Sequence, residues 1–228
     1  MSGTSEKEAK PLMSGDGAGP RRLAVTDVPG HVPYARGLEM QDDLVARRRD
    51  GQAGDTLLLL EHEPVYTIGR TRERSSLGAV PMLPHPVHEI SRGGQATYHG
   101  PGQLTGYPIV DLTRCGRDLH RYLRLLEQAL IDTCACFGVK ARRLEGMTGV
   151  WIEDRKLASI GVGVRRWISL HGFAINLTPE SLSGFQAITP CGISGVKMTC
   201  LAAESPHPID RSRFTEALVP ALENVLYG

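Results

Sequence analysis

Cys191 is a candidate nucleophile in this sequence. It lies between Pro190 and Gly192, residues that favour a tight and accessible turn, and it belongs to no periodic apolar stripe. A thiol attacks as its thiolate, and a reference pKa of about 8.5 leaves only a few per cent ionised at neutral pH. A useful nucleophile at this position therefore needs a nearby cation or base; an inert structural cysteine is the alternative.

Three residues are candidates for that cation or base: Lys156, His99 and His171. Lys156 leads directly into an apolar stretch at residues 157–162, so it differs from an ordinary surface lysine of a hairpin, which is the other interpretation. Catalytic partners meet in space and not along the chain, so the residues alone leave this choice open.

Glycines are concentrated in residues 91–108, a segment that also carries Arg92, Tyr98 and His99. This density lets the backbone adopt left-handed conformations and approach a ligand closely. The spacing matches neither the phosphate loop G-x-x-x-x-G-K-[ST] nor a G-x-G-x-x-G turn that opens a helix, so nucleotide binding is not supported. The segment is either part of a binding site or a β-hairpin with glycine turns. Its glycines are Gly93, Gly94, Gly100, Gly102 and Gly106.

The composition excludes several classes of protein. The chain has 228 residues, with 26 Lys+Arg against 25 Asp+Glu, so its formal charge of +1 argues against a globally basic nucleic-acid binder. The longest uninterrupted run of large apolar residues, at 57–60, is far too short to span a membrane. Residues 1–20 are polar and rich in Gly, Ser and Pro, so we expect a disordered tail there and a single domain over residues 21–228.

The five cysteines are an odd number and occur without a secretory signal, so we expect free thiols and a cytoplasmic location. Cys134 and Cys136 form C-x-C with no second pair at metal spacing, and Cys200 has apolar neighbours. We interpret these three as structural and expect no metal site.

The order of elements predicts an α+β fold. Helical periodicity covers residues 34–49, 118–137 and 214–226, the last with Pro220 as an expected kink. Strand patterns cover residues 56–61, 65–68, 149–152, 157–162 and 168–177, with a tight turn at 153–155 and a loop at 78–89. Strands and helices do not alternate regularly, which favours one α+β domain with antiparallel pairing.

Four motifs resemble those of the lipoyl(octanoyl) transferase family. They are Arg-Gly-Gly-Gln-Ala-Thr-Tyr-His-Gly-Pro-Gly-Gln (92–103), Lys-Leu-Ala-Ser-Ile-Gly (156–161), His-Gly-Phe-Ala-Ile-Asn (171–176) and Pro-Cys-Gly-Ile (190–193). The resemblance runs from about residue 23 to the C-terminus. It implies a mixed, largely antiparallel sheet with flanking helices, like the catalytic domain of biotin and lipoate protein ligases. It also implies transfer of octanoyl (or lipoyl) from octanoyl-acyl carrier protein to a lysine of a lipoyl domain, through a thioester on a cysteine.

The resemblance also implies roles for particular residues. Cys191 would be the acyl-thioester nucleophile, and Lys156 the residue that activates its thiol. The expected acceptors are lipoyl domains of 2-oxoacid dehydrogenase complexes and the glycine cleavage H protein, with no cofactor, nucleic acid or membrane involved. The substrate site would be lined by Arg92, Gly93, Gly94, Gln95, Ala96, Thr97, Tyr98, His99, Ser159, Ile160, Gly161, Gly172, Phe173 and Ala174.

Other functions stay open on the residues alone. They are an ATP-dependent lipoate or biotin ligase, a non-catalytic module that binds an acylated carrier protein, and a thioesterase. If the partners are acidic proteins, local basic patches must attract them, because the net charge is near zero. The candidate arginines, which are otherwise ordinary solvated side chains, are Arg70, Arg72, Arg74, Arg142, Arg143, Arg165 and Arg166.

Overall fold

A computed structural model describes residues 23–70, 74–77, 80–192 and 195–228. Within this part of the chain, eight strands form one mixed sheet in the order β1-β2-β6-β10-β9-β8-β7, with β11 paired to β9, and three form a second sheet in the order β4-β3-β5. The large-sheet strands are β1 (Ala24–Val32), β2 (Thr56–His62), β6 (Gln103–Ile109), β7 (Arg142–Leu144), β8 (Met147–Ile152), β9 (Arg155–Arg165), β10 (Ile168–Asn176) and β11 (Lys197–Met198). The small-sheet strands are β3 (Val65–Ile68), β4 (Val87–Glu89) and β5 (Thr97–His99).

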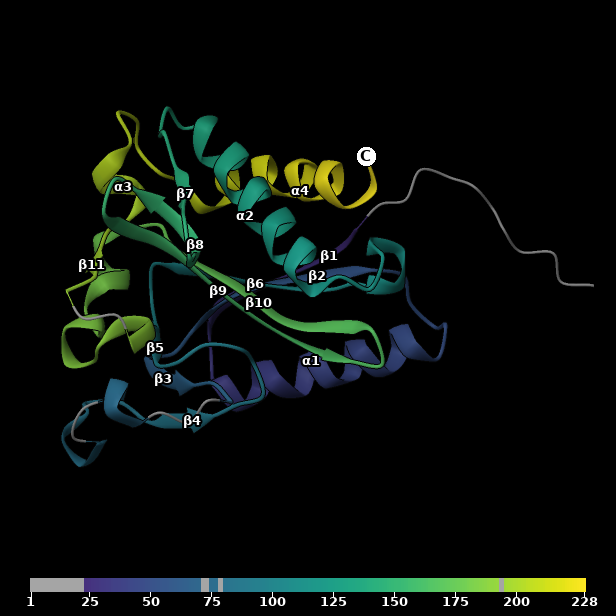
Figure 1. The fold of residues 1–228 in the computed structure, drawn as a ribbon, viewed down its shortest axis with the longest axis horizontal. Helices are drawn as coiled ribbons and strands as arrows, with labels where there is room; N and C mark the ends of the chain where they lie inside the picture. Colours follow the sequence, from purple (N-terminus) through teal and green to yellow (C-terminus); the bar gives the residue numbers. More distant parts are fainter. Residues whose placement is uncertain (1–22, 71–73, 78–79, 193–194) are drawn as a thin grey trace, which may run out of the picture.

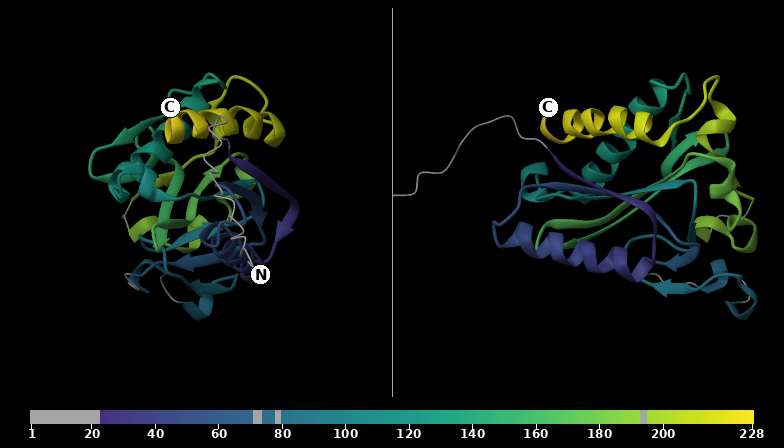
Figure 2. Two further views of the ribbon diagram at one scale, coloured as in Figure 1. Left: turned by 90° about the vertical axis from the view of Figure 1, so that its right-hand side faces the viewer. Right: turned by 180° about the vertical axis from the view of Figure 1, so that it is seen from behind.

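Helices cover both faces of the large sheet (Figures 1 and 2). On one face lie α2 and α4, and on the other lies α1 together with the small sheet. The α-helices are α1 (Tyr34–Arg49), α2 (Leu119–Ala135), α3 (Leu201–Glu204) and α4 (Arg211–Tyr227). The short 3-10 helices are η1 (Arg74–Leu77), η2 (Val80–Met82), η3 (Leu112–Cys115), η4 (Pro179–Leu182), η5 (Phe185–Ala187) and η6 (Pro190–Gly192).

The four leucines of β2 show why this strand is apolar throughout. Side chains alternate between the faces of a strand. Leu57 and Leu59 pack into the core under α2 and α4, whereas Leu58 and Leu60 pack into the core under α1. A strand covered on both faces needs apolar residues at every position, which explains the continuous run.

Aspartates cap the N-termini of α2 and α4, the two long helices on the first face. Asp118 accepts a hydrogen bond from the Arg121 N–H at 2.9 Å, and Asp210 accepts one from the Arg213 N–H at 2.9 Å. The apolar face of α4 consists of Phe214, Leu218 and Leu222, all fully buried at four-residue spacing; Pro220 lies inside the same helix. The predicted helices at 34–49, 118–137 and 214–226 are thereby confirmed within two or three residues at each end.

The prediction of a mixed, largely antiparallel sheet is confirmed, as are the five predicted strands. The pairs β1–β2 and β11–β9 are parallel, and the remaining pairs of the large sheet are antiparallel. The predicted tail, residues 1–20, lies outside the described residues. None of the helices in the described ranges combines the length and the apolar character needed to span a membrane.

Three local features differ from what the sequence predicts. The predicted loop at 78–89 contains η2 and β4, because Val87 pairs with Tyr66 of β3, a long-range contact that the local sequence does not encode. The exposed edge strand β1 was not predicted. The hairpin interpretation of residues 91–108 also fails, because β5 pairs with β3 in the small sheet while β6 pairs with β2 and β10 in the large one.

The turn at Gly100–Gly102 therefore carries the chain from one sheet to the other. Gly102 adopts φ +77°, and a Cβ there would lie 2.1 Å from the Thr178 hydroxyl oxygen. Glycine satisfies both the left-handed backbone and the close approach of the neighbouring chain. The two sheets meet at this turn, next to the pocket described below.

Candidate active site

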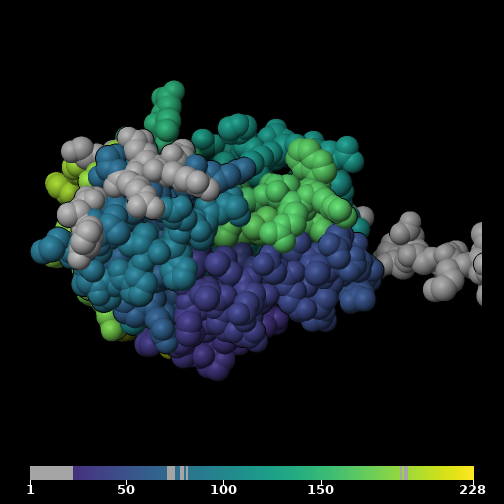
Figure 3. Space-filling view, turned by 90° about the horizontal axis from the view of Figure 1, so that it is seen from below, coloured from purple at the N-terminus to yellow at the C-terminus, as the bar shows by residue number. Residues whose placement is uncertain are grey.

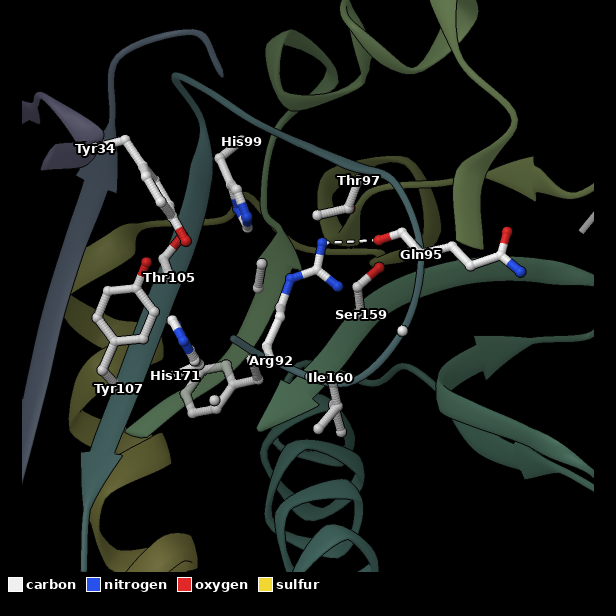
Figure 4. Close-up of a pocket in the computed structure, with 15 residues that line it drawn as sticks. Tyr34, Arg92, Gln95, Thr97, His99, Thr105, Tyr107, Ser159, Ile160 and His171 are labelled. Atoms are coloured by element: carbon white, nitrogen blue, oxygen red, sulfur yellow. Dashed lines mark hydrogen bonds between the residues drawn. The ribbon is translucent and has the colours of Figure 1, made fainter. Parts of the chain in front are cut away.

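A pocket lies at the junction of the two sheets (Figure 4), and the space free of atoms amounts to about 490 Å³ when its open mouth is counted. Its walls come from the start of α1, the segment before β5, and the strands β5, β6, β9 and β10. The lining residues are Tyr34, Arg92, Gly94, Gln95, Thr97, His99, Thr105, Tyr107, Ser159, Ile160, Gly161, His171, Gly172, Phe173 and Ala174.

Two of the four sequence motifs meet in this pocket through the register of β9 and β10. Antiparallel pairing places Ser159 opposite Ala174, Ile160 opposite Phe173 and Gly161 opposite Gly172. Eleven of the fourteen residues expected to line a substrate site do line this pocket. Gly93, Ala96 and Tyr98 do not.

Alternation along β5 explains why part of the first motif turns away from the pocket. Thr97 and His99 face the pocket, whereas Ala96 and Tyr98 pack into a separate apolar cluster with Tyr66 and Phe185. Gly93 contributes through its backbone, since its N–H donates to the Val162 carbonyl at 3.0 Å. These three residues therefore pack next to the pocket wall and do not line the pocket.

Arg92 places a buried guanidinium at the centre of the pocket (Figure 4). It donates to the carbonyl and the hydroxyl oxygen of Thr67, at 3.1 and 2.9 Å, and to the carbonyl of Gln95 at 2.9 Å. These acceptors are neutral groups, and they fix the orientation of the guanidinium. The positive charge helps to lower the pKa of His99 and of His171, for which burial is the main cause.

A chain of amides fixes the tautomer of His99. The Asn176 amide nitrogen donates to the Thr199 carbonyl at 2.9 Å, so its oxygen accepts from the Gln103 amide nitrogen, also at 2.9 Å. The Gln103 oxygen is then the acceptor for His99 Nδ1–H at 2.8 Å. His99 Nε2 is consequently left without a proton, 3.5 Å from the Thr67 hydroxyl. Burial, the neighbouring His62 and Arg92 hold the pKa of His99 well below its usual value, so the ring is neutral.

A second polar chain enters the pocket from the α1 side. His62 Nδ1–H donates to the Val32 carbonyl at 2.9 Å, so Nε2 accepts from the Tyr107 hydroxyl at 2.7 Å. The Tyr107 oxygen can then accept from Tyr34, whose hydroxyl it contacts. Burial lowers the pKa of His62 to about 4 and raises that of Tyr34 to about 12, so both are neutral at pH 7.

The pocket has three further lining residues that the sequence motifs do not predict: Tyr34, Thr105 and Tyr107. Gln103, Thr105 and Tyr107 alternate along β6 as polar residues on one face, a signal that the glycine pattern obscured. Tyr34 starts a helix and offers no comparable signal.

Several polar atoms of the pocket have no hydrogen-bond partner within the part of the chain that the structure describes. They are the hydroxyls of Thr97, Thr105 and Ser159 and both ring nitrogens of His171, all of them buried. A buried polar group without a hydrogen bond destabilises the folded state by about 1–3 kcal/mol, so such groups usually bind a ligand or a water molecule. Their concentration at one pocket indicates a ligand that carries polar atoms as well as apolar surface.

The turn with Cys191 lies at the Gln95 end of the pocket. The backbone of η6 forms the expected tight turn, in which Gly192 adopts φ +68° and its N–H donates to the Thr189 carbonyl at 3.0 Å. A Cβ on Gly192 would lie 1.6 Å from Gln95 Oε1, so the Gln95 side chain is packed directly against this turn. The Thr189 N–H also donates to the Ser76 carbonyl at 2.8 Å, which fastens the turn to η1.

Lys156 is buried at the start of β9, three residues before Ser159. Its Nζ lies 5.2 Å from the centre of the Trp151 ring. It pairs with Met198 of β11, the strand that follows the Cys191 turn in the chain. Gly149 makes room for the side chain, because a Cβ there would lie 2.8 Å from Lys156 Cε.

Three of the seven arginines expected to form basic patches have acidic or carbonyl partners. Arg143 binds Glu127 at 2.9 Å, Arg165 binds Asp42 at 2.9 Å and Arg142 donates to the Glu153 carbonyl at 3.1 Å. Arg165 lies nine residues along β9 from Lys156, about 30 Å away. Arg72 lies outside the described residues.

The other cysteines match their structural interpretation in part. Cys134 and Cys200 are buried, and Cys136 is exposed at the end of α2. Among the described residues, no three His, Cys, Asp or Glu side chains come together as a metal site.

The fold is that of the catalytic domains of lipoate and biotin protein ligases. A lipoate-protein ligase A bound with ATP superposes with a TM-score of 0.66 at 17% identity, over 90% of this chain and 85% of that one. A biotin protein ligase from Aquifex aeolicus gives a TM-score of 0.54 at 12% identity, over 89% and 70%.

Comparison of sequences identifies the family. The family model described as lipoyl protein ligase A/B catalytic domain matches residues 33–223, and the chain belongs to this family. A protein of Geobacter sulfurreducens named octanoyltransferase is 53% identical over 178 residues, which cover 78% of this chain and 74% of the relative. An octanoyltransferase of Rubrobacter xylanophilus is 46% identical over 210 residues, which cover 90% and 94%.

Proposed function

We propose that Cys191 carries an octanoyl group as a thioester between octanoyl-acyl carrier protein and a lysine of a lipoyl domain. The chain is an octanoyltransferase of protein lipoylation, like the relatives to which it is about half identical. The observation that supports the proposed route is the packing of Gln95 against the Cys191 turn, because it joins the candidate nucleophile to the pocket built from the other motifs.

In the first half-reaction, Lys156 takes the proton of the Cys191 thiol. The thiolate attacks the carbonyl carbon of the donor thioester, and the carbon–sulfur bond to the carrier's phosphopantetheine breaks. The departing sulfur takes the proton back from the Lys156 ammonium. The products are the acyl-enzyme, the free carrier thiol and a neutral Lys156.

In the second half-reaction, the amine of the acceptor lysine attacks the acyl-enzyme. An amide bond forms, the bond to Cys191 sulfur breaks, and the amine loses a proton to neutral Lys156 or to a pocket histidine. His99 is a suitable histidine, since its Nε2 carries no proton. Both half-reactions start from an activated acyl group and therefore consume no ATP.

The pocket offers the octanoyl chain an apolar strip along the paired strands β9 and β10. Ile160, Phe173 and Ala174 contribute it. At about 0.8 kcal/mol per buried CH₂, the chain would contribute about 5 kcal/mol to binding. The unpaired hydroxyls of Thr97, Thr105 and Ser159 would bind polar atoms of the substrate or water molecules beside it.

The proposed partners are octanoyl-acyl carrier protein as donor, and lipoyl domains of 2-oxoacid dehydrogenase complexes and the glycine cleavage H protein as acceptors. The proposed location is the cytoplasm. Arg165 and Arg166 are poor candidates for steering the donor, since about 30 Å of β9 separates them from Lys156.

Intact-mass spectrometry tests the proposed route. The protein is incubated with octanoyl-acyl carrier protein and no ATP, alongside Cys191→Ser and, as a matched control, Cys136→Ser at an exposed cysteine. We expect one octanoyl adduct that disappears in Cys191→Ser and persists in Cys136→Ser. An adduct that requires ATP would indicate a ligase instead. Carrier binding without an adduct would indicate a binding module, and release of free octanoate faster than transfer would indicate a thioesterase.

A further inference from the structure

His171 lines the pocket and also a second cavity. A groove with about 520 Å³ of empty space runs between α1, the segment before Arg92 and the hairpin of β9 and β10, on the face shown in Figure 3. Among the described residues, His171 is the one that lines both cavities. The groove is also lined by Leu38, Gln41, Asp42, Glu89, Ile90, Ser91, Arg165 and Leu170.

The His171 ring is held in this position by its backbone. The residue adopts φ +58° in the middle of β10, a left-handed conformation that is unfavourable for a residue with a side chain. Gln41 of α1 accepts a hydrogen bond from the His171 N–H at 2.8 Å, which fixes the local backbone against α1. His171 is 3% exposed, and neither of its ring nitrogens has a hydrogen-bond partner among the described residues. No hydrogen bond of the ring explains this unfavourable backbone conformation. The conformation therefore suggests that the position of the ring has a functional role.

The ring lies at the end of the pocket opposite the Cys191 turn. Figure 4 shows Gln95 on one side of Arg92, with Tyr34, Tyr107 and His171 on the other. The register of the sheet agrees, because Ser159 lies opposite Ala174 and Val162 lies opposite His171, three residues farther from Lys156. Those three residues correspond to about 10 Å along the strand.

The length of an octanoyl chain matches this distance. Its seven carbon–carbon bonds advance about 1.2 Å each when extended, close to the reach per bond of an extended peptide, and so span about 8 Å. A chain whose carbonyl lies beside Ser159 would therefore end at the row of His171. A dodecanoyl chain, with eleven such bonds, would span about 13 Å and would have to pass the ring.

We propose that His171 is the wall that ends the acyl pocket and thereby limits the length of the acyl chain. This inference rests on the proposed function, since it takes the pocket beside the paired strands β9 and β10 as the acyl site. The neutral ring suits the role, because burial lowers its pKa to about 4 and a charged ring would disfavour a hydrocarbon end. With the wall removed, the pocket would open into the groove, whose Leu38 and Leu170 offer apolar surface to a longer chain.

The test compares acyl-carrier proteins loaded with eight-carbon and twelve-carbon chains. His171→Gly removes the ring and suits the left-handed backbone, and His171→Asn, which also tolerates that conformation, replaces it if the glycine variant does not fold. We expect the ratio of kcat/KM for the twelve-carbon chain to that for the eight-carbon chain to rise at least about tenfold over the wild-type ratio. His171→Phe keeps a ring in place without its nitrogens and should preserve the preference for eight carbons.

Leu38→Ala is the matched control on the groove side. It widens the groove without touching the pocket, so the ratio should stay at the wild-type value. A changed ratio in this variant, or an unchanged ratio in His171→Gly or His171→Asn, would overturn the inference. Failure of the proposed function looks different, because the wild-type protein would then form no eight-carbon acyl-enzyme on Cys191.

Discussion

The Gln95 side chain occupies the space that a side chain at Gly192 would need. A Cβ on Gly192 would lie 1.6 Å from Gln95 Oε1 and 2.3 Å from its Cδ. Gly192 follows the candidate nucleophile, and Gln95 belongs to the glycine-rich motif that forms one wall of the pocket. Two motifs about a hundred residues apart in the sequence therefore pack against each other. Their contact lies next to Cys191, the residue to which the acyl group would be attached.

Gly192→Ala should abolish most of the acyl transfer. The new methyl group would force Gln95 away from the turn and strain a backbone at φ +68°. We expect the rate of Cys191 acylation to fall at least about a hundredfold, as a displacement of about 1 Å in a reacting group commonly does. The rate is measured by intact mass with octanoyl-acyl carrier protein.

Gly195→Ala is the control for backbone strain alone. Gly195 also has a left-handed backbone, at φ +78°, but no described residue has an atom within 4 Å of a Cβ there. Both variants should lose about 1 kcal/mol of unfolding free energy, whereas only Gly192→Ala should lose acylation. Equal acylation rates in the two variants would show that the contact with Gln95 is irrelevant to the reaction.

The elements of this fold were predictable where local pattern and tertiary structure agree. Leu57 through Leu60 predict a strand covered on both faces, and the four-residue spacing of Phe214, Leu218 and Leu222 predicts α4. Val87 begins a strand because Tyr66 lies beside it, about twenty residues earlier in the chain. A pairing of that kind leaves no local pattern, so β4 was interpreted as a loop.

The site was predictable in its motifs and not in its geometry. The four motifs identify most of the lining residues, because they carry the family's chemistry. Tyr34 reaches the pocket from the first residue of α1, and the alternation that turns Tyr98 away follows from the pairing of β5 with β3. Neither fact can be read from the spacing of residues along the chain.

Acid should destabilise the protein through its buried histidines. The pKa values of His62 and His171 are lowered to about 4, mainly by burial, while the unfolded chain protonates near its usual 6.5. As the pH falls from about 6.5 to 4, these histidines bind protons in the unfolded state but not in the native state. Each histidine thereby lowers the free energy of unfolding by up to about 3 kcal/mol. The stability that depends on the neutral native rings is fully present above pH 6.5 and is lost as the pH falls toward 4.

Urea unfolding at a series of pH values measures this effect. Between about pH 7 and 4.5, the loss of unfolding free energy should be about 2 kcal/mol smaller in His171→Asn than in the wild-type protein. His207→Asn, at an exposed histidine, should follow the wild-type curve. Parallel curves for His171→Asn and the wild type would mean that His171 is protonated in the native state.

Glu127→Gln should destabilise the fold without removing any apolar contact. The carboxylate of Glu127 is fully buried and accepts hydrogen bonds from Arg124 at 2.6 Å, Arg143 at 2.9 Å and the Gly149 N–H at 3.0 Å. Loss of the charge leaves two arginines weakly paired. Because both are partly exposed, we expect a loss of about 2 kcal/mol, below the 3–5 kcal/mol typical of fully buried pairs. Urea unfolding checks this value; Glu145→Gln, at an exposed position, should change it by less than about 0.5 kcal/mol.

Gly149→Ala should reduce the reactivity of Cys191 through Lys156. A methyl group at Gly149 would lie 2.5 Å from the Ala158 carbonyl oxygen and 2.8 Å from Lys156 Cε, so both the β8–β9 pairing and the Lys156 side chain must shift. If Lys156 activates the thiol, the pH midpoint of Cys191 alkylation by iodoacetamide, followed peptide by peptide, should shift upward in this variant and in Lys156→Ala alike. Gly146→Ala, which has a left-handed backbone at φ +75° and open space around its Cβ, should keep the wild-type midpoint. A Gly149→Ala midpoint equal to that of the wild type, in protein shown to be folded, would remove Lys156 from the activation of Cys191.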